Sequence, residues 1–290
     1  MHSYLAILER ILEDGEEKPT RTDIPTIAIP GATFEHNMSE GFPLLTTRKM
    51  PFKSSRVETE GFIKGITDKK WYQERGCKFW NEWCRKDKVP YATDEETKAK
   101  MVAERDLGPI YGFQWRHFGA EYESFDTNYA GRGIDQLAKT IETLKKDQTD
   151  RKQVISAWNP VDIPQMALEP CHYAFHPFII GKKLHLTWSQ RSVDGARGLP
   201  NNISQYALTL HLIAKELNLE EGKLIGQLED THLYVNQIQG VEEQLKREPR
   251  QLPKIETKNF TSIFEWTYDQ TNLIDYNPDE RKIDFGEIAV

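Results

Sequence analysis

Cys171 is a candidate nucleophile in this 290-residue sequence. It lies in the segment ALEPCHYAF, directly after Pro170 and at the start of a predicted strand. A cysteine becomes a nucleophile when nearby positive charge lowers its pKa and favours the thiolate. The adjacent His172 cannot be its local partner, because neighbouring residues of a strand point to opposite faces. Cys171 is therefore either a small buried hydrophobic residue or a nucleophile whose partner comes from elsewhere in the chain.

Polar residues between positions 189 and 208 could supply that partner. The guanidinium of Arg191 and the hydroxyl of Ser192 suit a phosphate group, and the guanidinium could also stabilise a thiolate. An asparagine amide donates and accepts hydrogen bonds at once, which matches the N–H and carbonyl on one edge of uracil. Each residue also has an ordinary structural explanation: a surface ion pair for Arg191, and turn or helix-capping chemistry for Asp194, Asn201 and Asn202.

Helices and strands must hold these residues in place. Apolar residues at helical spacing predict an amphipathic helix at the N-terminus and further helices at 53–66, 69–76, 134–147 and about 202–217. Strands are predicted at 153–158, 171–180 and 183–190, with a hairpin turn at Gly181-Lys182-Lys183. No linker or repeat divides the sequence, so we expect a single α+β domain over residues 1–290. The polar stretch 84–106 is expected to be a partly helical surface insertion.

Composition limits the classes of function. The net charge of −7 argues against a general nucleic-acid or membrane-surface binder, so any phosphate should be held by a few placed arginines. The three cysteines form no CxxC pair, which suits a reducing compartment. The N-terminal segment lacks the continuous apolar run of a signal peptide, so we expect a cytoplasmic protein. No metal site is expected.

Several segments in the same order carry a family resemblance. They are GFPLLTTRK (41–49), FWNEW (79–83), DLGPIYGFQWRHF (106–118), ISAWNP (155–160), ALEPCH (167–172), QRSVDGARGLPNN (190–202), DTHLYVNQ (230–237), REPRQLPK (247–254) and the terminal Ala289-Val290. With them the sequence resembles the thymidylate synthase family along most of its length. The resemblance implies an α+β fold whose mixed sheet, flanked by helices, forms the interface of a homodimer. It also implies methylenetetrahydrofolate as co-substrate.

The resemblance further implies roles for individual residues. Cys171 would attack carbon 6 of 2′-deoxyuridylate (dUMP) and activate carbon 5. Glu58 would organise water and proton transfer, Tyr111 would act in proton abstraction, and Asn202 would read the base and, with Asp194, belong to the catalytic set. The implied phosphate and sugar ligands are Arg21, Arg191, Ser192, His232 and Tyr234, joined by Arg151 and Lys152 from the partner subunit. The residues implied around the folate are Trp80, Leu168, Asp194, Gly198 and Val290.

The sequence departs from the family pattern mainly near the folate. Arg197 and Asn201 stand where ordinary synthases have a leucine and a phenylalanine. Lys152 stands where the family has an arginine, and an ammonium group cannot make the same bidentate contact with phosphate. Arg48-Lys49 inverts the usual order of these two residue types, and Glu60-Gly61 replaces an apolar pair.

Two departures, Glu60 and Asn201, resemble a branch of the family, the phage deoxycytidylate hydroxymethylases. In that branch water adds to the exocyclic methylene at carbon 5, and a polar wall would favour water. Since Asn202 suits uracil, the sequence favours a deoxyuridylate hydroxymethylase, which would be phage-encoded and act in the host cytoplasm. The alternatives are a thymidylate synthase and a non-catalytic nucleotide-binding homologue. Glu60 could equally be a solvated helix residue, pointing about 200° away from Glu58, and Asn201 a helix cap.

Overall fold

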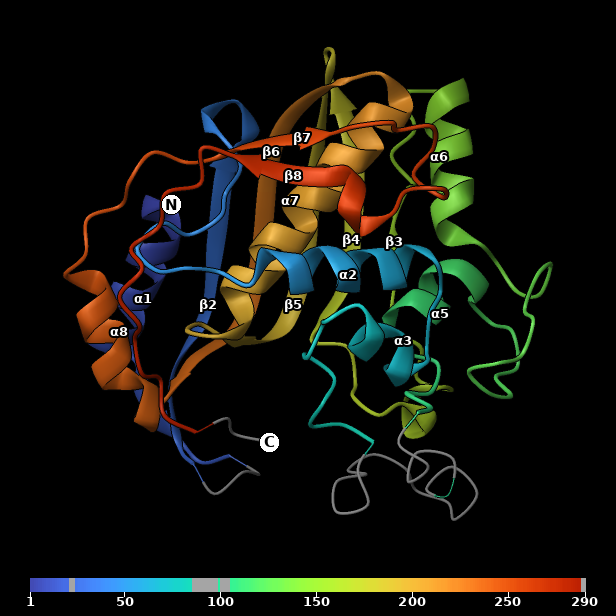
Figure 1. Cartoon of the computed structure of the whole chain (residues 1–290). Coiled ribbons are helices and arrows are strands. Elements are labelled where there is room, and N and C mark those ends of the chain that lie inside the picture. Colours follow the sequence, from blue (N-terminus) through green and yellow to red (C-terminus); the bar gives the residue numbers. More distant parts are fainter. Residues whose placement is uncertain (21–23, 85–98, 100–104, 288–290) are drawn as a thin grey trace.

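The computed structural model describes residues 1–20, 24–84, 99 and 105–287. Its centre is a six-stranded sheet with strand order β1-β2-β6-β5-β4-β3 (Figure 1). Neighbouring strands are antiparallel, except that β5 and β6 are parallel. The strands are β1 Glu16–Lys18, β2 Thr26–Asn37, β3 Ile155–Ser156, β4 His172–Ile180, β5 Lys183–Asp194 and β6 Glu220–Tyr234. Arg21, Val290 and most of the predicted insertion at 84–106 lie outside the described residues.

Helices and a small second sheet surround the large sheet. The helices are α1 His2–Asp14, α2 Phe52–Ile63, α3 Lys69–Glu74, α5 Tyr111–His117, α6 Gln136–Lys146, α7 Gly198–Leu217 and α8 Ile238–Leu245. The small antiparallel sheet pairs β7 Lys254–Thr257 with β8 Thr271–Ile274. Helix α7 connects β5 to β6 and packs on both strands, and α2 packs on α7 (Figure 1). Within the described ranges no helix has the length and apolar character needed to cross a membrane.

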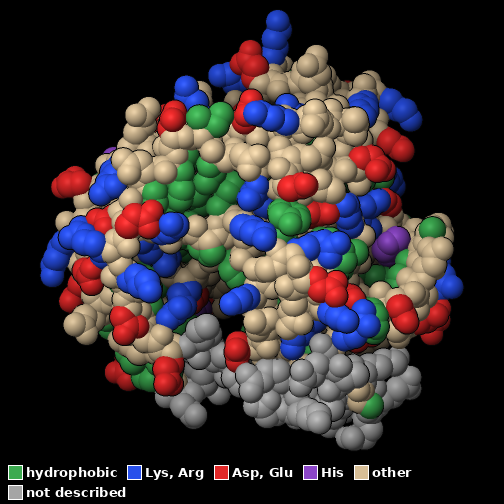
Figure 2. Space-filling model, viewed as in Figure 1, with side chains coloured by type: hydrophobic (Ala, Val, Ile, Leu, Met, Phe, Trp, Pro, Cys, Tyr) green, Lys and Arg blue, Asp and Glu red, His purple; other side chains and the backbone are tan. Residues whose placement is uncertain are grey.

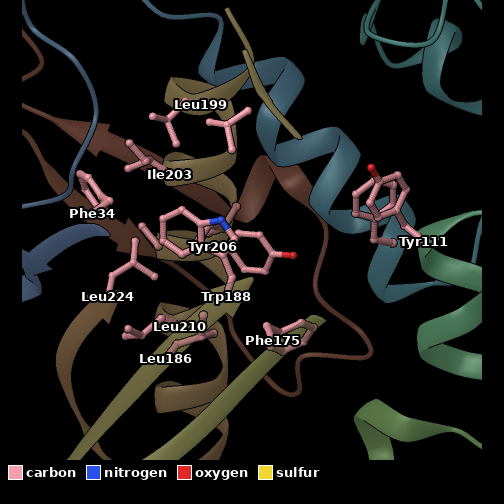
Figure 3. Packing of buried hydrophobic residues seen from close by; sticks show 14 of the residues in the cluster. Phe34, Tyr111, Phe175, Leu186, Trp188, Leu199, Ile203, Tyr206, Leu210 and Leu224 are labelled. Carbon is pink, nitrogen blue, oxygen red and sulfur yellow. The ribbon is translucent and has the colours of Figure 1, made fainter. Parts of the chain in front are cut away.

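The hydrophobic core lies between α7 and the large sheet. Trp188 of β5 is fully buried and stacks on Tyr206 of α7, with ring centroids 5.2 Å apart. Leu186, Leu210 and Leu224 surround this pair (Figure 3). Along β5, buried residues alternate with partly exposed ones, so one face of the strand enters the core. The opposite face, with His185, Thr187 and Ser189, remains partly exposed in the single chain.

The fold class is confirmed as α+β, with a mixed sheet flanked by helices. The predicted helices at 53–66, 69–76 and 134–147 are present, and each ends before its predicted last residue. The predicted hairpin is also confirmed, because β4 and β5 pair antiparallel from Ile180 and Lys183 onwards. Gly181 in its turn has a φ of +63°, a left-handed conformation that glycine adopts without strain.

Two predicted boundaries are wrong. Helix α7 begins at Gly198 rather than near residue 202, so Pro200 lies in its first turn, where a missing backbone N–H costs nothing. Asn201 is therefore inside the helix and is not its cap. The strand predicted at 153–158 is reduced to Ile155–Ser156. There the side chain of Gln136 replaces a neighbouring strand: its Oε1 accepts the backbone N–H of Ser156 at 3.0 Å, and its Nε2 donates to the carbonyl of Ser156 at 2.8 Å.

Glu60 is not a solvated helix residue, because it is only 3% exposed. One carboxylate oxygen pairs with Lys64 at 2.6 Å, and the other accepts the backbone N–H of Tyr268 at 2.8 Å. The bond to Lys64 is made at the end of α2 itself, and the bond to Tyr268 ties α2 to the segment before β8. Glu60 therefore helps to hold in place the helix that carries Glu58.

Close packing of α2 gives a first prediction. A Cβ added at Gly61 would lie 2.3 Å from a ring carbon of Tyr72, whose buried hydroxyl is bonded to the carbonyl of Ile66 at 2.9 Å. Gly61→Ala should therefore lower the free energy of unfolding by about 1–3 kcal/mol, measured by urea denaturation. As a control, the exposed Lys53→Ala in the same helix should change it by less than about 0.5 kcal/mol. Equally small effects would mean that the Tyr72 ring can move aside.

Candidate active site

Cys171 is held at the point where β4 and β5 begin to pair. Its carbonyl accepts the backbone N–H of Arg191 at 2.9 Å, and its own N–H donates to the hydroxyl of Tyr111 at 2.8 Å. The residue is partly exposed. The backbone of Cys171 is thus fixed between β5 and the start of α5, while its side chain remains accessible.

Arg191 lies beside the residues that precede Cys171. Its Nε donates to the carbonyl of Pro170 at 3.0 Å, and an Nη donates to the carboxylate of Glu169 at 3.1 Å. Its guanidinium also sits 5.2 Å from the ring centre of Trp158. The side chains of Arg191 and Glu169 are 31% and 29% exposed, so their ion pair contributes little to stability. The pair does hold the guanidinium of Arg191 next to the Cys171 segment.

Tyr111 is the middle of a stack of rings behind Cys171. Its ring lies 4.4 Å from that of His172 and 4.8 Å from that of Phe62. Burial raises the pKa of Tyr111 well above its usual range and lowers the pKa of His172 to about 3. His172 is therefore neutral at physiological pH, and one ring nitrogen bonds to the hydroxyl of Tyr206 at 2.8 Å. It packs against Tyr111, in agreement with the expectation that it is not the local base of Cys171.

A chain of side-chain hydrogen bonds joins β5, α7 and α2. Gln190 of β5 donates to Oδ1 of Asn202 at 3.0 Å, and Nδ2 of Asn202 donates to Gln205 at 3.2 Å. Gln205 in turn donates to the carboxylate of Glu58. The sequence motifs identified Asn202 and Glu58 but missed both glutamines. Gln205 could have been found from its spacing, because residues three apart on a helix lie on one face.

Glu58 is the most perturbed carboxyl group of this set. Burial raises its pKa to about 7, and the hydrogen bond from Gln205 lowers it in part. The indole N–H of Trp80 also lowers it, although it lies outside hydrogen-bond geometry. Near neutral pH this group can therefore gain and lose a proton, as proton transfer requires.

The parallel pairing of β5 and β6 brings further predicted residues together. Ser192 lies opposite Asp230, and Asp194 lies opposite His232. His232 is 8% exposed, with its Nδ1 3.2 Å from the carboxylate of Asp230, and its ring packs edge-on against that of Tyr234.

The face carrying α2 and α7 is hollowed, and Lys and Arg side chains lie around the hollow (Figure 2). Such local positive charge attracts an anionic ligand even in a chain of net negative charge.

Asp194 fixes the turn between β5 and α7. One carboxylate oxygen accepts the backbone N–H groups of Ala196 and Arg197 at 3.0 and 2.9 Å, and the other accepts Gln237 at 3.2 Å. The expected turn chemistry is therefore present. It sets the position of Gly198, where α7 starts, and so the position of Asn202 one turn later.

Several predicted residues lie elsewhere. Arg151 and Lys152 are exposed before the edge strand β3, and the Lys152 side chain is 86% exposed and 3.5 Å from Asp150. Leu168 is partly buried just before the Cys171 segment. Their predicted roles at the phosphate and the folate remain predictions, as do those of Arg21 and Val290.

Two residues at positions predicted to face the folate, Trp80 and Asn201, have a buried polar atom without a hydrogen-bond partner among the described residues. These atoms are Nε1 of Trp80 and Oδ1 of Asn201. Buried polar groups normally have one, so each is suited to a ligand or to ordered water. Trp80 also packs edge-on against Tyr111 at 6.2 Å, which places it near the Cys171 site. Among residues 1–20, 24–84, 99 and 105–287, no set of three His, Cys, Asp or Glu side chains is arranged to hold a metal ion.

Comparison with known proteins agrees with these features. The sequence profile described as thymidylate synthase matches residues 2–289. The chain is 37% identical over 280 residues to the bifunctional dihydrofolate reductase-thymidylate synthase of Paramecium tetraurelia, covering 97% of this chain but only 60% of that protein. It is 38% identical over 279 residues to the thymidylate synthase of Homo sapiens (95% and 87% covered). It is 40% identical over 286 residues to that of Agaricus bisporus (95% of each covered).

The raised pKa of Glu58 predicts a pH-dependent stability. The folded chain keeps a proton on Glu58 up to about pH 7, whereas the unfolded chain loses it near 4.5, so the free energy of unfolding falls as pH rises through this window. Glu58→Gln removes the titrating group. Its free energy of unfolding relative to the natural protein should increase by about 2–3 kcal/mol between about pH 5 and about pH 8, measured by urea denaturation.

A matched control for this prediction is Glu142→Gln, an exposed residue of α6. It should follow the natural protein at both pH values. If the difference between Glu58→Gln and the natural protein stays constant with pH, Glu58 does not carry a raised pKa.

Proposed function

Because this chain belongs to the thymidylate synthase family, we propose that it methylates carbon 5 of dUMP to give dTMP. Members of the family are one-carbon transferases that use methylenetetrahydrofolate. The observation that carries the proposal is the arrangement around Cys171. Its backbone is bonded to Tyr111, and the Glu58, Gln205 and Asn202 chain is fixed on the adjoining helices.

In the proposed reaction, the thiolate of Cys171 adds to carbon 6 of uracil and forms a C–S bond. The electron pair of the 5,6 double bond moves to carbon 5 and is delocalised onto the carbonyl oxygen at position 4, which makes carbon 5 nucleophilic. When bound, methylenetetrahydrofolate supplies the one-carbon unit and then the hydride. Loss of the proton at carbon 5 and departure of the Cys171 thiolate restore the ring.

The side chains around Cys171 have separate tasks in this proposal. Arg191 provides positive charge near the thiolate and the nucleotide phosphate. Asn202 pairs with the edge of the base, and Glu58, with a pKa of about 7, exchanges protons with water near carbonyl oxygen 4. Tyr111 accepts the N–H of Cys171 through its oxygen, which leaves its own O–H to donate towards the reacting ring.

Methylation is favoured over the hydroxymethylation predicted from the sequence. Two of the relatives given above are named thymidylate synthase and the third bifunctional dihydrofolate reductase-thymidylate synthase, and none of these names is that of a hydroxymethylase. Both carboxylate oxygens of Glu60 are occupied by Lys64 and Tyr268, so Glu60 offers no argument for water addition. Nothing in these relatives supports a phage source.

The proposal includes a homodimer in which each subunit completes the site of the other. The partly exposed face of the large sheet supports it, as do two exposed hydrophobic residues, Val154 at 54% and Val161 at 79% exposed. Hydrophobic residues so exposed favour association with another protein surface. Arg151 and Lys152 would then contribute their charges to the phosphate site of the partner.

The product of the reaction tests the proposed chemistry. With dUMP and methylenetetrahydrofolate, the purified protein should form dTMP and one dihydrofolate per nucleotide, measured by mass spectrometry and absorbance. Cys171→Ser should bind dUMP and form no product, because the hydroxyl is a far weaker nucleophile. A hydroxymethyl product with release of tetrahydrofolate would instead establish the hydroxymethylase, and dUMP binding without product would establish a non-catalytic homologue.

Mixing an inactive variant, Cys171→Ser, with a variant of weakened dUMP binding, Arg151→Ala, tests the shared site. Arg151→Ala should raise the KM for dUMP by about tenfold to a hundredfold, because a charge-assisted phosphate contact contributes about 1.5–3 kcal/mol. Mixed with Cys171→Ser under conditions that exchange subunits, it should recover activity at dUMP concentrations near the KM of the natural protein, since one of the two sites then has both residues. Lack of recovery, with mixed dimers demonstrated by mass spectrometry, would show that Arg151 acts within its own subunit.

A further inference from the structure

The hydrogen-bond chain through Asn202 has a donor at one end and an acceptor at the other. At one end, the indole N–H of Trp188 donates to Oε1 of Gln190 at 3.1 Å. Gln190 then donates to Asn202, Asn202 to Gln205, and Gln205 to Glu58. Gln190 is 2% exposed and Gln205 5% exposed, so water competes little for these bonds.

The partners of Gln190 fix the direction of the bond that it makes to Asn202. The oxygen and nitrogen of a single amide cannot be told apart by shape, and their assignment depends on their partners. Indole can only donate, and the backbone carbonyl of Ser192, to which Gln190 also donates, can only accept. A flipped Gln190 amide would oppose two donors at Trp188 and two acceptors at Ser192, each an expensive buried mismatch. The amide of Asn202 therefore has one stable orientation, with Oδ1 towards Gln190 and Nδ2 towards Gln205.

We infer that Gln205, together with Gln190, is a positioning residue that sets the preference for uracil over cytosine by fixing the Asn202 amide. This inference rests on the proposed function, in which Asn202 meets the base. In the fixed orientation Asn202 retains one lone pair on Oδ1 and one hydrogen on Nδ2. The Oδ1 lone pair accepts a hydrogen bond from N3–H of uracil, and the Nδ2 hydrogen is donated to the uracil oxygen at position 4. Cytosine presents the opposite pattern, an acceptor at N3 and a donor amino group, so only a flipped amide would match it.

Each glutamine contributes one of the two anchors against this flip. Without Gln205, Nδ2 of Asn202 loses its acceptor, and only the bond from Gln190 resists rotation. Gln190 also donates to the backbone carbonyl of Ser192 at 3.0 Å, which holds this second anchor in place. Removing either glutamine should therefore reduce discrimination, and removing both should reduce it further, because specificity is a difference between two affinities.

The test compares the affinities of the full-length protein for dUMP and dCMP by calorimetry. Gln205→Met keeps the length of the side chain and removes its hydrogen bonds, and should lower the dUMP-to-dCMP affinity ratio about tenfold. Gln190→Met should lower the ratio by a similar factor, and gives a second measurement if Gln205→Met does not fold. Asn202→Asp should reverse the preference, because a carboxyl oxygen can accept a hydrogen bond from the amino group of cytosine and, when the group is protonated, its O–H can donate to N3.

Gln244→Met is the matched control. Gln244 is fully buried in α8 and donates to Thr47, outside the chain through Asn202. This variant should keep the ratio of the natural protein. If Gln205→Met and Gln190→Met weaken both nucleotides equally, the glutamines are only structural and the inference is overturned. If the natural protein binds neither nucleotide, the proposed function itself fails, and the inference with it.

Discussion

The bond between Gln205 and the buried carboxylate of Glu58 is the interaction on which the site depends. Burying a carboxyl group is costly unless it is hydrogen-bonded or neutral, and here it is bonded and has a pKa of about 7. The donor comes from α7 and the acceptor from α2, so the bond also joins two helices that pack on each other. Glu60 strengthens the arrangement by tying α2 to the segment before β8.

The parallel pair of β5 and β6 provides the second constraint. Parallel neighbours need a crossover, and α7 makes it over the core side of the sheet. As a result the last residues of β5, the turn at Asp194 and the first turn of α7 follow one another within a short stretch of chain. His232 joins them from β6 because it lies opposite Asp194. The polar residues thus converge at one end of a rigid sheet, where their side chains lose little freedom on binding.

Local patterns predicted the parts of this arrangement that depend on neighbouring residues. The hairpin of β4 and β5 followed from its glycine turn, and the rejection of His172 as a local base followed from strand alternation. Contacts between distant segments were not predictable in this way. The hydrogen bonds of Gln190 and Gln205 form only because β5 and α2 pack against α7 in the folded chain. The bond between Tyr206 and His172 likewise joins two segments that are distant in the sequence. The start of α7 differs from the predicted position near residue 202, because a proline is also compatible with the first turn of a helix.

The residues that depart from the family pattern fall into two groups: those whose polar atoms are bonded within the fold, and those with a polar atom that has no partner among the described residues. Glu60 is used entirely within the fold. Arg197 donates to the carbonyl of Gly286 at 2.5 Å, and Arg48 to that of Ala196 at 2.5 Å, with both guanidiniums near the ring of Phe285. These two arginines therefore join the start of α7 to the C-terminal segment. Nδ2 of Asn201 donates to the carbonyl of Arg197, and its Oδ1 has no partner among the described residues. A polar substitution alters chemistry only through atoms that the fold leaves open, and in Asn201 that atom is Oδ1.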